Sequence, residues 1–128
     1  MSVCCSINDS LGAAIDSVLA LEPRPDQILI EASGVADPAK VATYGQGWPG
    51  CQLDAVVVLA DVETIRERSA DPFVGELVTR QLSAGDLVLL TKTDLVDADA
   101  ARTTLRWVAH RAGNSVPVVP CDRDTIDV

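Results

Sequence analysis

The fold is decided by one stretch of the chain, Ile28-Leu29-Ile30-Glu31-Ala32-Ser33-Gly34-Val35-Ala36-Asp37-Pro38. Its three leading apolar residues predict a short strand with a carboxylate, Glu31, at the tip. A Ser-Gly turn follows, and Asp37-Pro38 has the form of a helix start, with a capping side chain before a proline in the first turn. Ligands of parallel α/β sheets sit at the carboxyl ends of the strands, so Glu31 suits a magnesium–nucleotide site.

Length and composition limit the classes of protein to which the chain can belong. The chain has 128 residues and is 48% hydrophobic, which predicts one domain with a real core rather than a disordered chain. Nineteen acidic residues against ten basic ones, a net charge of -9, argue against nucleic acid and against an anionic membrane as partners. The first residues lack the basic and apolar regions of a signal peptide, so we expect a cytoplasmic location with cysteines as thiols or ligands.

Strand-like and helix-like stretches alternate along the chain. Apolar runs predict strands at 28–30, 55–60, 87–90 and 116–119, and amphipathic stretches predict helices over about 10–21, from Pro38, from Asp71 and over about 98–112. The helix after Asp71 is expected to turn Phe73, Leu77 and Val78 inward, and 45–50 is expected to be loop because Gly and Pro are dense there. The alternation predicts an α/β fold, a parallel sheet with helices on both faces.

Three of the four predicted strands end in polar residues that are able to bind a ligand. These are Glu31, Asp61 and the turn Thr91-Lys92-Thr93-Asp94. A single acid after a strand is usually a turn former or a helix cap, and Asp61 alone has that interpretation. Three such ends on one rim of a parallel sheet favour a binding site.

The turn Thr91-Lys92-Thr93-Asp94 resembles the guanine-reading Asn/Thr-Lys-x-Asp motif of GTP-binding proteins. The Asp94 carboxylate is able to accept hydrogen bonds from the ring N–H and the exocyclic amine of guanine, a donor pair that adenine does not have. The aliphatic stem of Lys92 can lie against the base while its ammonium stays in water. The hydroxyl of Thr91 can brace the loop.

Taken together, these motifs resemble the CobW-like family of P-loop GTPases, which are proposed metal chaperones. Residues 28–38 are similar to the family's Walker B strand, 53–61 to its strand ending in aspartate, and 81–94 to its guanine segment, with Thr91 where asparagine is usual. Val3-Cys4-Cys5-Ser6 is similar to the end of its Gly-Cys-x-Cys-Cys-Ser metal motif, whose first cysteine would fall at Ser2. The resemblance covers nearly the whole chain and implies that 1–128 is one partial nucleotide-binding domain.

The resemblance also implies roles for individual residues. Glu31 would hold Mg²⁺ near the γ-phosphate, Gly34 would let the backbone approach that phosphate, and Lys92 and Asp94 would hold guanine. Asp61 and Thr91, on the same rim, complete the expected nucleotide-binding set. Cys4 and Cys5 would bind Zn(II), with further ligands needed to close a tetrahedral site. The implied function is GTP binding and hydrolysis coupled to delivery of zinc or cobalt to a client metalloprotein, with cobalamin synthesis as one family role.

The sequence departs from the family pattern in the phosphate-binding loop. A Walker A loop reads G-x-x-x-x-G-K-[ST], and the only two lysines here, Lys40 and Lys92, do not follow a glycine. We therefore expect a fragment without the N-terminal Walker A part, which by itself neither binds GTP tightly nor hydrolyses it. The Walker A strand is central in such sheets, so its loss is expected to leave unpaired edges on hydrophobic strands.

Two other interpretations remain open at this stage. One is a catalytically inactive α/β interaction domain that keeps the fold without nucleotide chemistry. The other is a flavodoxin-like or receiver-type domain, which also has acidic strand ends, although the Thr91–Asp94 turn and the 28–38 stretch count against it. Cys51, Cys121 and His110 are expected to be ordinary thiols and a surface residue.

Overall fold

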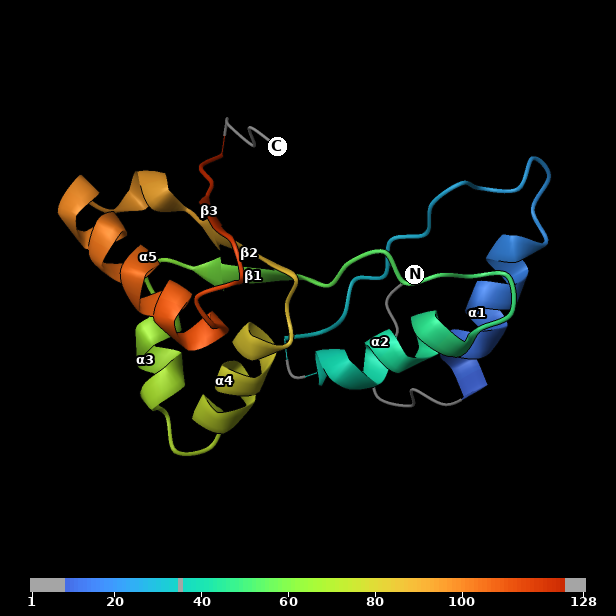
Figure 1. Ribbon diagram of the computed structural model, residues 1–128, viewed down its shortest axis with the longest axis horizontal. Helices are drawn as coiled ribbons and strands as arrows, with labels where there is room; N and C mark the ends of the chain where they lie inside the picture. Colours follow the sequence, from blue (N-terminus) through green and yellow to red (C-terminus); the bar gives the residue numbers. More distant parts are fainter. Residues whose placement is uncertain (1–8, 35, 124–128) are drawn as a thin grey trace. The chain divides into compact units, whose positions relative to one another are not determined.

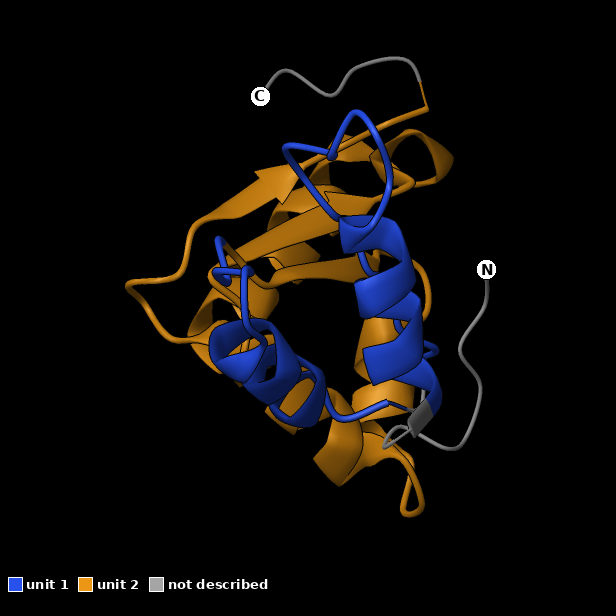
Figure 2. Cartoon of the chain, turned by 90° about the vertical axis from the view of Figure 1, so that its right-hand side faces the viewer, with its two compact units in different colours: residues 1–54 blue, residues 55–128 orange. Residues whose placement is uncertain are grey.

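The computed structural model describes residues 9–34 and 36–123, which fall into two compact units, 1–54 and 55–128 (Figure 2). Unit 1 contains helices α1 (Asp9–Leu19) and α2 (Pro38–Gly47). Unit 2 contains the strands β1 (Val57–Asp61), β2 (Leu87–Thr91) and β3 (Val118–Pro120), the helices α3 (Ile65–Ala70), α4 (Gly75–Ser83) and α5 (Ala98–Ala112), and the short 3₁₀ turn η1 (Thr93–Leu95). None of the described helices combines the length and hydropathy that crossing a bilayer requires.

Unit 2 is built on a parallel sheet in the order β1-β2-β3, with α3, α4 and α5 beside it (Figure 1). Alternate strand residues point to opposite faces, and Ala60, Val88 and Leu90 are fully buried against the helices. Val78 and Leu82 of α4 and Val108 of α5 close the same core. The predicted fold class is confirmed as an α/β domain of the P-loop NTPase type, incomplete; helices on the second face of the sheet stay a prediction.

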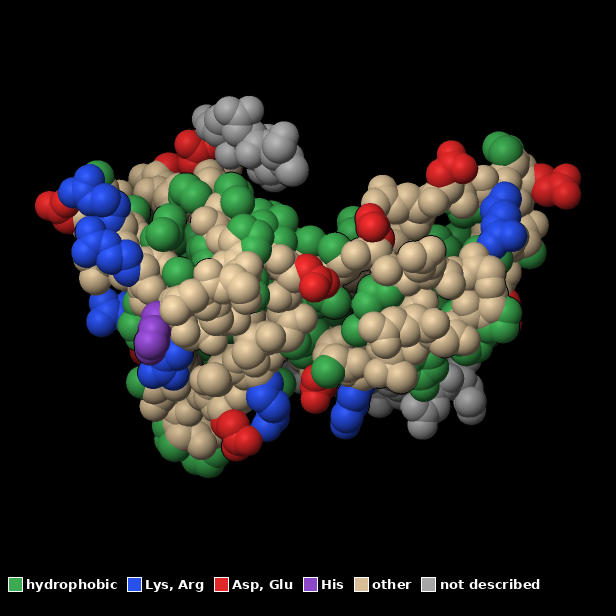
Figure 3. Space-filling view, in the orientation of Figure 1, with side chains coloured by type: hydrophobic (Ala, Val, Ile, Leu, Met, Phe, Trp, Pro, Cys, Tyr) green, Lys and Arg blue, Asp and Glu red, His purple; other side chains and the backbone are tan. Residues whose placement is uncertain are grey.

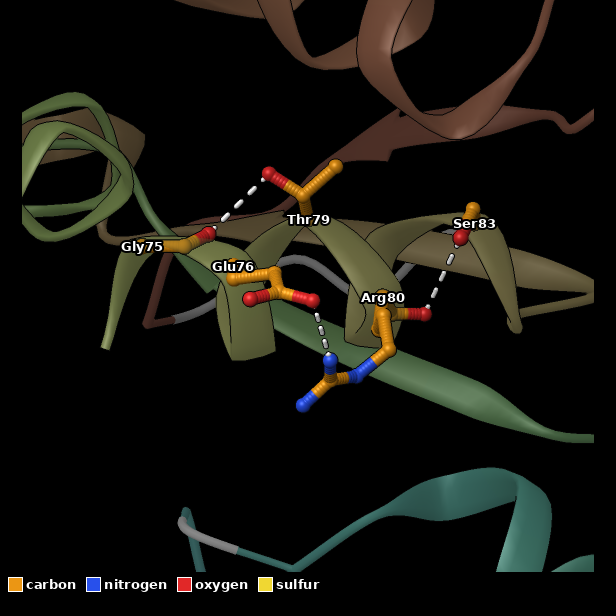
Figure 4. A network of polar contacts seen from close by, with 5 residues as sticks. All are labelled: Gly75, Glu76, Thr79, Arg80 and Ser83. Carbon is orange, nitrogen blue, oxygen red and sulfur yellow. Dashed lines mark hydrogen bonds and ion pairs between the residues drawn. The ribbon is translucent and has the colours of Figure 1, made fainter. Parts of the chain in front are cut away.

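Helix α4 has one side exposed to water and one side packed in the core. The half-buried Thr79 donates to the Gly75 carbonyl at 3.0 Å, and on the exposed side Arg80 pairs with the Glu76 carboxylate at 2.7 Å. Ser83 donates to the Arg80 carbonyl at 3.1 Å (Figure 4). These contacts lie three or four residues apart, the spacing at which helical side chains are neighbours.

The strand predicted at 28–30 is wrong, because the described backbone there is irregular. Leu29 is 93% exposed and Ile30 is 36% exposed, so neither packs as a strand residue of a sheet would. Apolar β-branched residues form a strand only when neighbouring backbone completes their hydrogen bonds. The other three predicted strands are confirmed, but their ends are shifted. The strand predicted at 55–60 begins at Val57, and the strand predicted at 116–119 begins at Val118.

Helix α2 extends further than the sequence indicates. Its start is as predicted, since the Asp37 carboxylate accepts from Ala39 N–H and Pro38 occupies the first turn. The prediction that 45–50 is all loop is wrong, because α2 continues to Gly47. Trp48 anchors this end within unit 1: its indole N–H donates to Asp16 at 2.8 Å, and its backbone N–H donates to the Tyr44 carbonyl. That anchoring offsets the roughly 1 kcal/mol by which each helical glycine is less favourable than alanine.

The segment before α4 corrects one predicted core residue. The Asp71 carboxylate accepts from the backbone N–H groups of Phe73 and Val74, so the chain turns here and Phe73 is 91% exposed. Val78 is buried as predicted and Leu77 is half-buried. Helix α3 was not predicted, because Arg66, Glu67 and Arg68 indicate only a solvated charged face; buried Ile65 is what ties it to the core.

Candidate functional site

The carboxyl ends of β1 and β2 meet on one rim of unit 2. The two strands are parallel, and their register places Asp61 directly beside Thr91. The Thr91 hydroxyl donates to the Ala60 carbonyl at 3.3 Å, and Val62 N–H donates to the Thr91 carbonyl at 3.1 Å. These bonds tie the two strand ends together where they leave the sheet.

The loop after β2 turns sharply at Lys92. This residue has φ 61° and ψ 31°, and among the described residues it is the only one other than glycine with positive φ. Side chains disfavour this left-handed conformation, so a lysine adopts it only when surrounding contacts hold the loop. Leu95 N–H donates to the Lys92 carbonyl at 3.0 Å and closes η1, which carries Asp94.

The chain after β3 supplies the contacts that hold this loop. Cys121 N–H donates to the Leu90 carbonyl at 2.8 Å, which extends the β2–β3 ladder to the rim. The Cys121 carbonyl then accepts both the backbone N–H of Thr93, at 3.2 Å, and its hydroxyl, at 3.0 Å. Sequence reasoning missed Thr93 as a loop-holding residue. The feature of the sequence that indicates this role is the hydroxyl of Thr93 at the variable third position of the Thr-Lys-x-Asp motif.

Lys92 and Asp61 form an ion pair across the rim. The Lys92 Nζ lies 2.6 Å from Asp61 Oδ2, and Asp61 Oδ1 accepts from Glu63 N–H at 2.9 Å. Partial burial works to raise the pKa of the Asp61 carboxyl, but the hydrogen bonds from Lys92 and from the backbone outweigh it and hold that pKa below its ordinary value. The hydrogen bond to Asp61 and its charge raise the pKa of Lys92. Asp61 is therefore both a turn cap, as its strand-end position indicates, and the anchor of Lys92.

The Asp94 carboxylate differs from that of Asp61 because, among the described residues, no donor bonds to its oxygens. It is exposed on η1, and among the described residues its carboxylate has no hydrogen-bond or ion-pair partner. An unpaired carboxylate on a braced loop offers two acceptor oxygens at a fixed place. Two acceptor oxygens on this loop are able to receive a pair of N–H donors from a ligand.

The remaining predicted site residues lie elsewhere. Glu31 and Gly34 belong to unit 1, on the irregular segment before α2, and both are exposed. The structure thus brings together Asp61, Thr91, Lys92 and Asp94 in unit 2, while Glu31 and Gly34 stand in the other unit. Cys4 and Cys5 lie outside the described residues, and no group of His, Cys, Asp and Glu suited to a metal ion occurs in 9–34 and 36–123.

The other candidate residues are ordinary. Cys121 is buried and Cys51 is half-buried, and both are free thiols as expected. His110 is exposed on α5 as expected. Trp107 is half-buried, with the Arg111 guanidinium 5.0 Å from its ring centroid. Trp107 and Arg111 border an open groove of about 720 Å³ between α3 and α5, lined by Val62, Glu63, Arg66, Glu67, Ser69, Ala70, Val96, Ala100, Thr104, Trp107 and Arg111.

Comparison with known proteins gives consistent matches. A family model described as "CobW/HypB/UreG, nucleotide-binding domain" matches residues 2–120. The chain is 29% identical to a protein named zinc chaperone CobW from Sinorhizobium sp., over 91% of this chain. It is 28% identical to the zinc chaperone CobW of Pseudomonas aeruginosa, over 94% of this chain. It is also 29% identical to the zinc-regulated GTPase metalloprotein activator 1 of Schizosaccharomyces pombe, over 77% of this chain.

The matches cover only part of each relative. They span 39% of the Sinorhizobium protein, 38% of the Pseudomonas protein and 24% of the yeast protein. No solved structure matches the chain significantly.

Proposed function

Because the chain belongs to the CobW/HypB/UreG nucleotide-binding domain family, we propose that it contributes the guanine-reading and Walker B elements of a GTP-binding metallochaperone G domain. The observation that carries this proposal is the Thr91–Asp94 loop. The loop is held at the carboxyl end of β2 by Thr93 and Cys121, and the Asp94 carboxylate on it has no partner among the described residues.

Each rim residue has a role in this proposal. Asp94 accepts the ring N–H and the exocyclic amine of guanine, and it rejects adenine because that base leaves the carboxylate without two donors. The stem of Lys92 lies along the base, and its ammonium is held by Asp61 at 2.6 Å. Thr91 joins the two strand ends and keeps the loop in register.

The family resemblance implies phosphate-side roles for two residues of unit 1. Glu31 is proposed to bind Mg²⁺ beside the γ-phosphate, directly or through a water, and an exposed carboxylate suits that hard cation. Gly34 is proposed to admit the phosphate close to the backbone, which a side chain there would obstruct. GTP and Mg²⁺ are accordingly the nucleotide and the cofactor of the proposal.

Zinc is the proposed cargo. Two of the relatives described above are named zinc chaperones, and thiolates such as those of Cys4 and Cys5 suit Zn(II) better than they suit Mg²⁺. A client metalloprotein that receives the ion is the proposed protein partner. Cobalt is the alternative cargo.

The test is an NMR titration of the 128-residue chain with guanosine and, separately, with adenosine. Millimolar guanosine is expected to shift the amide signals of Thr91 to Asp94 and of Cys121, and adenosine at the same concentration is expected to leave them in place. Asp94→Ala is expected to abolish the guanosine response, whereas Glu67→Ala, which removes an exposed carboxylate from α3, is expected to keep it. Equal responses to the two nucleosides would favour an inactive interaction domain.

A further inference from the structure

The groove between α3 and α5 is separate from the proposed nucleotide-binding set, because none of its lining residues belongs to that set. The groove is open and has a volume of about 720 Å³. All of its lining residues fall between Val62 and Arg111, within unit 2, so one compact unit forms it alone. Among them Val62 is buried, and Val96 and Trp107 are half-buried, which gives the groove an apolar surface.

Helix α5 carries two adjacent rows of side chains whose members are spaced four, three and four residues apart. One row is buried or half-buried on the core side of the helix: Ala101, Leu105, Val108 and Ala112. The other row lies one residue earlier and lines the groove: Ala100, Thr104, Trp107 and Arg111. Side chains three and four residues apart form the ridges by which helices pack against each other. The groove-lining row therefore has the spacing of a helix–helix contact, and the groove separates it from α3.

Thr104, in the groove-lining row, has a buried hydroxyl without a partner. The residue is 5% exposed, and its hydroxyl forms no hydrogen bond with any described residue. Thr43 and Thr79, also in helices, donate instead to the carbonyl four residues earlier. Every fully enclosed side-chain N or O atom of the described residues is hydrogen-bonded, so the Thr104 hydroxyl reaches the groove. Because a buried hydroxyl without a partner costs free energy, a polar group in the groove gains a hydrogen bond there.

The two walls of the groove differ in charge. The α5 wall contributes one charged side chain, Arg111, whose guanidinium lies 5.0 Å from the Trp107 ring centroid. The α3 wall contributes two carboxylates and one guanidinium: Glu63, Glu67 and Arg66. Arg66, Glu67 and Arg111 form no ion pair with any described residue. Figure 3 shows further Lys and Arg side chains, and the histidine, on the α5 side of this unit. The α5 wall is therefore positive, and the α3 wall is negative on balance.

We propose that this groove binds one amphipathic helix of a partner protein, which packs on the groove-lining row of α5. The apolar side of the bound helix contacts Val62 and Trp107, and a polar side chain on it bonds to the Thr104 hydroxyl. Its acidic flank faces Arg111, and its basic flank faces Glu67 on α3. Ala100 is small and exposed, so it lets the backbone of the bound helix come close.

The form and the charge of the groove select this occupant. Small-molecule ligands are enclosed over most of their surface, whereas a bound helix needs only an open groove with apolar contacts along it. Walls of opposite net sign argue against nucleic acid, which presents negative charge on every side. A helix with one acidic and one basic flank matches both walls at once.

The first test is an NMR titration of the 128-residue chain with a synthetic helix of about 18 residues. Its leucines are spaced four, three and four apart, with glutamates on one flank and lysines on the other. We expect shifts of the Trp107 indole signal and of the α3 and α5 amides, with a dissociation constant below about 1 mM. A peptide with the same amino acids, ordered so that the leucines scatter around the helix, is expected to bind at least about tenfold more weakly. Equal binding of the two peptides, or no response to either, would overturn the proposal.

The second test changes the charge of one wall. Arg111→Glu makes both walls negative, so it is expected to weaken binding of the mixed-flank helix about tenfold or more and to favour a helix with lysines on both flanks. Arg106→Glu is the matched control, because it makes the same change on α5 outside the groove lining. It is expected to leave both affinities unchanged. Equal effects of the two substitutions would show that only the overall charge matters and would contradict the proposal.

The third test blocks the groove without a charge change, so it holds even if Arg111→Glu does not fold. Ala100→Gln puts a longer side chain into the groove and is expected to weaken the peptide about tenfold. Thr103→Gln, at an exposed position of α5 outside the groove lining, is expected to have no effect. If the same signals shift with protein concentration alone, the groove takes a second copy of the chain and the proposal is wrong.

Discussion

At the scale of single residues, the rim depends on backbone conformations that the surroundings impose. Lys92 is left-handed at φ 61°, and the Thr93–Cys121 bonds and the Asp61 ion pair hold it there. Gly113, after α5, adopts φ 102° as the glycine that ends a helix. Such residues are tested one at a time.

Gly113→Ala is expected to destabilise the protein by about 1–3 kcal/mol. A methyl group there meets nothing within 4 Å, so the whole effect comes from the positive φ. Gly47→Ala is the control, because it also meets open space but lies at the end of α2 without a positive φ, and it is expected to stabilise by about 0.5–1 kcal/mol. Urea unfolding followed by circular dichroism measures both; equal effects of the two changes would contradict this.

The Asp61–Lys92 pair predicts a pH dependence in the acid range. The pKa of Asp61 is lowered in the folded protein from its ordinary value of 3.8, so the unfolded chain takes up the proton at higher pH than the folded one. The stabilisation is therefore complete above that ordinary value and is lost as pH falls through the lowered pKa. Asp61→Asn is expected to flatten the acid limb of the unfolding free energy.

At the scale of helices and strands, the sequence predicts best where local chemistry and packing agree. Helix α5 combines a cap at Asp97, an apolar face with Val108 fully buried, and Gly113 at its end, and its bounds are as predicted. The Thr91–Asp94 loop was predicted because its chemistry lies in four adjacent residues. The bracing carbonyl of Cys121 was not predicted, because that contact joins residues 28 apart in the chain.

The predictions that are wrong concern segments whose structure depends on contacts beyond the local sequence. Residues 28–30 have strand composition, but strand formation depends on a neighbour that local composition does not contain. Phe73 was predicted to be buried from its spacing alone, and the turn made by Asp71 directs it outward. The end of α2 at Gly47 depends on Trp48 and its bond to Asp16, a long-range contact that outweighs glycine's poor helix propensity.

The N-cap of α5 gives a prediction at this scale. The Asp97 carboxylate accepts from Ala100 N–H at 2.8 Å, so Asp97→Ala is expected to destabilise the protein by about 0.5–2 kcal/mol. Asp97→Asn keeps an acceptor oxygen and is expected to lose much less. Thermal unfolding of the two variants checks the cap, and equal losses would show that the charge and not the hydrogen bond matters.

At the scale of the whole molecule, unit 2 has a one-sided core. Leu82 is 1% exposed among strand and helix side chains, so Leu82→Ala is expected to destabilise unit 2 by about 2–5 kcal/mol. Leu59→Ala, at a side chain 69% exposed, is expected to change stability by less than about 0.5 kcal/mol. Denaturant unfolding in dilute solution measures both, and a large loss for Leu59→Ala would contradict the exposure of that side chain.

The chain as a whole is expected to recognise the base of GTP without gaining affinity from its phosphates. Asp94 and Lys92 are the proposed guanine contacts, while the 128 residues contain no G-x-x-x-x-G-K-[ST] loop to hold phosphate, and the net charge of -9 repels it.

Calorimetric or NMR titration of the chain with guanosine and with GTP plus Mg²⁺ tests this most directly. The expected result is two weak dissociation constants that agree within about threefold. Micromolar binding of GTP, or no binding of guanosine at all, would contradict the account.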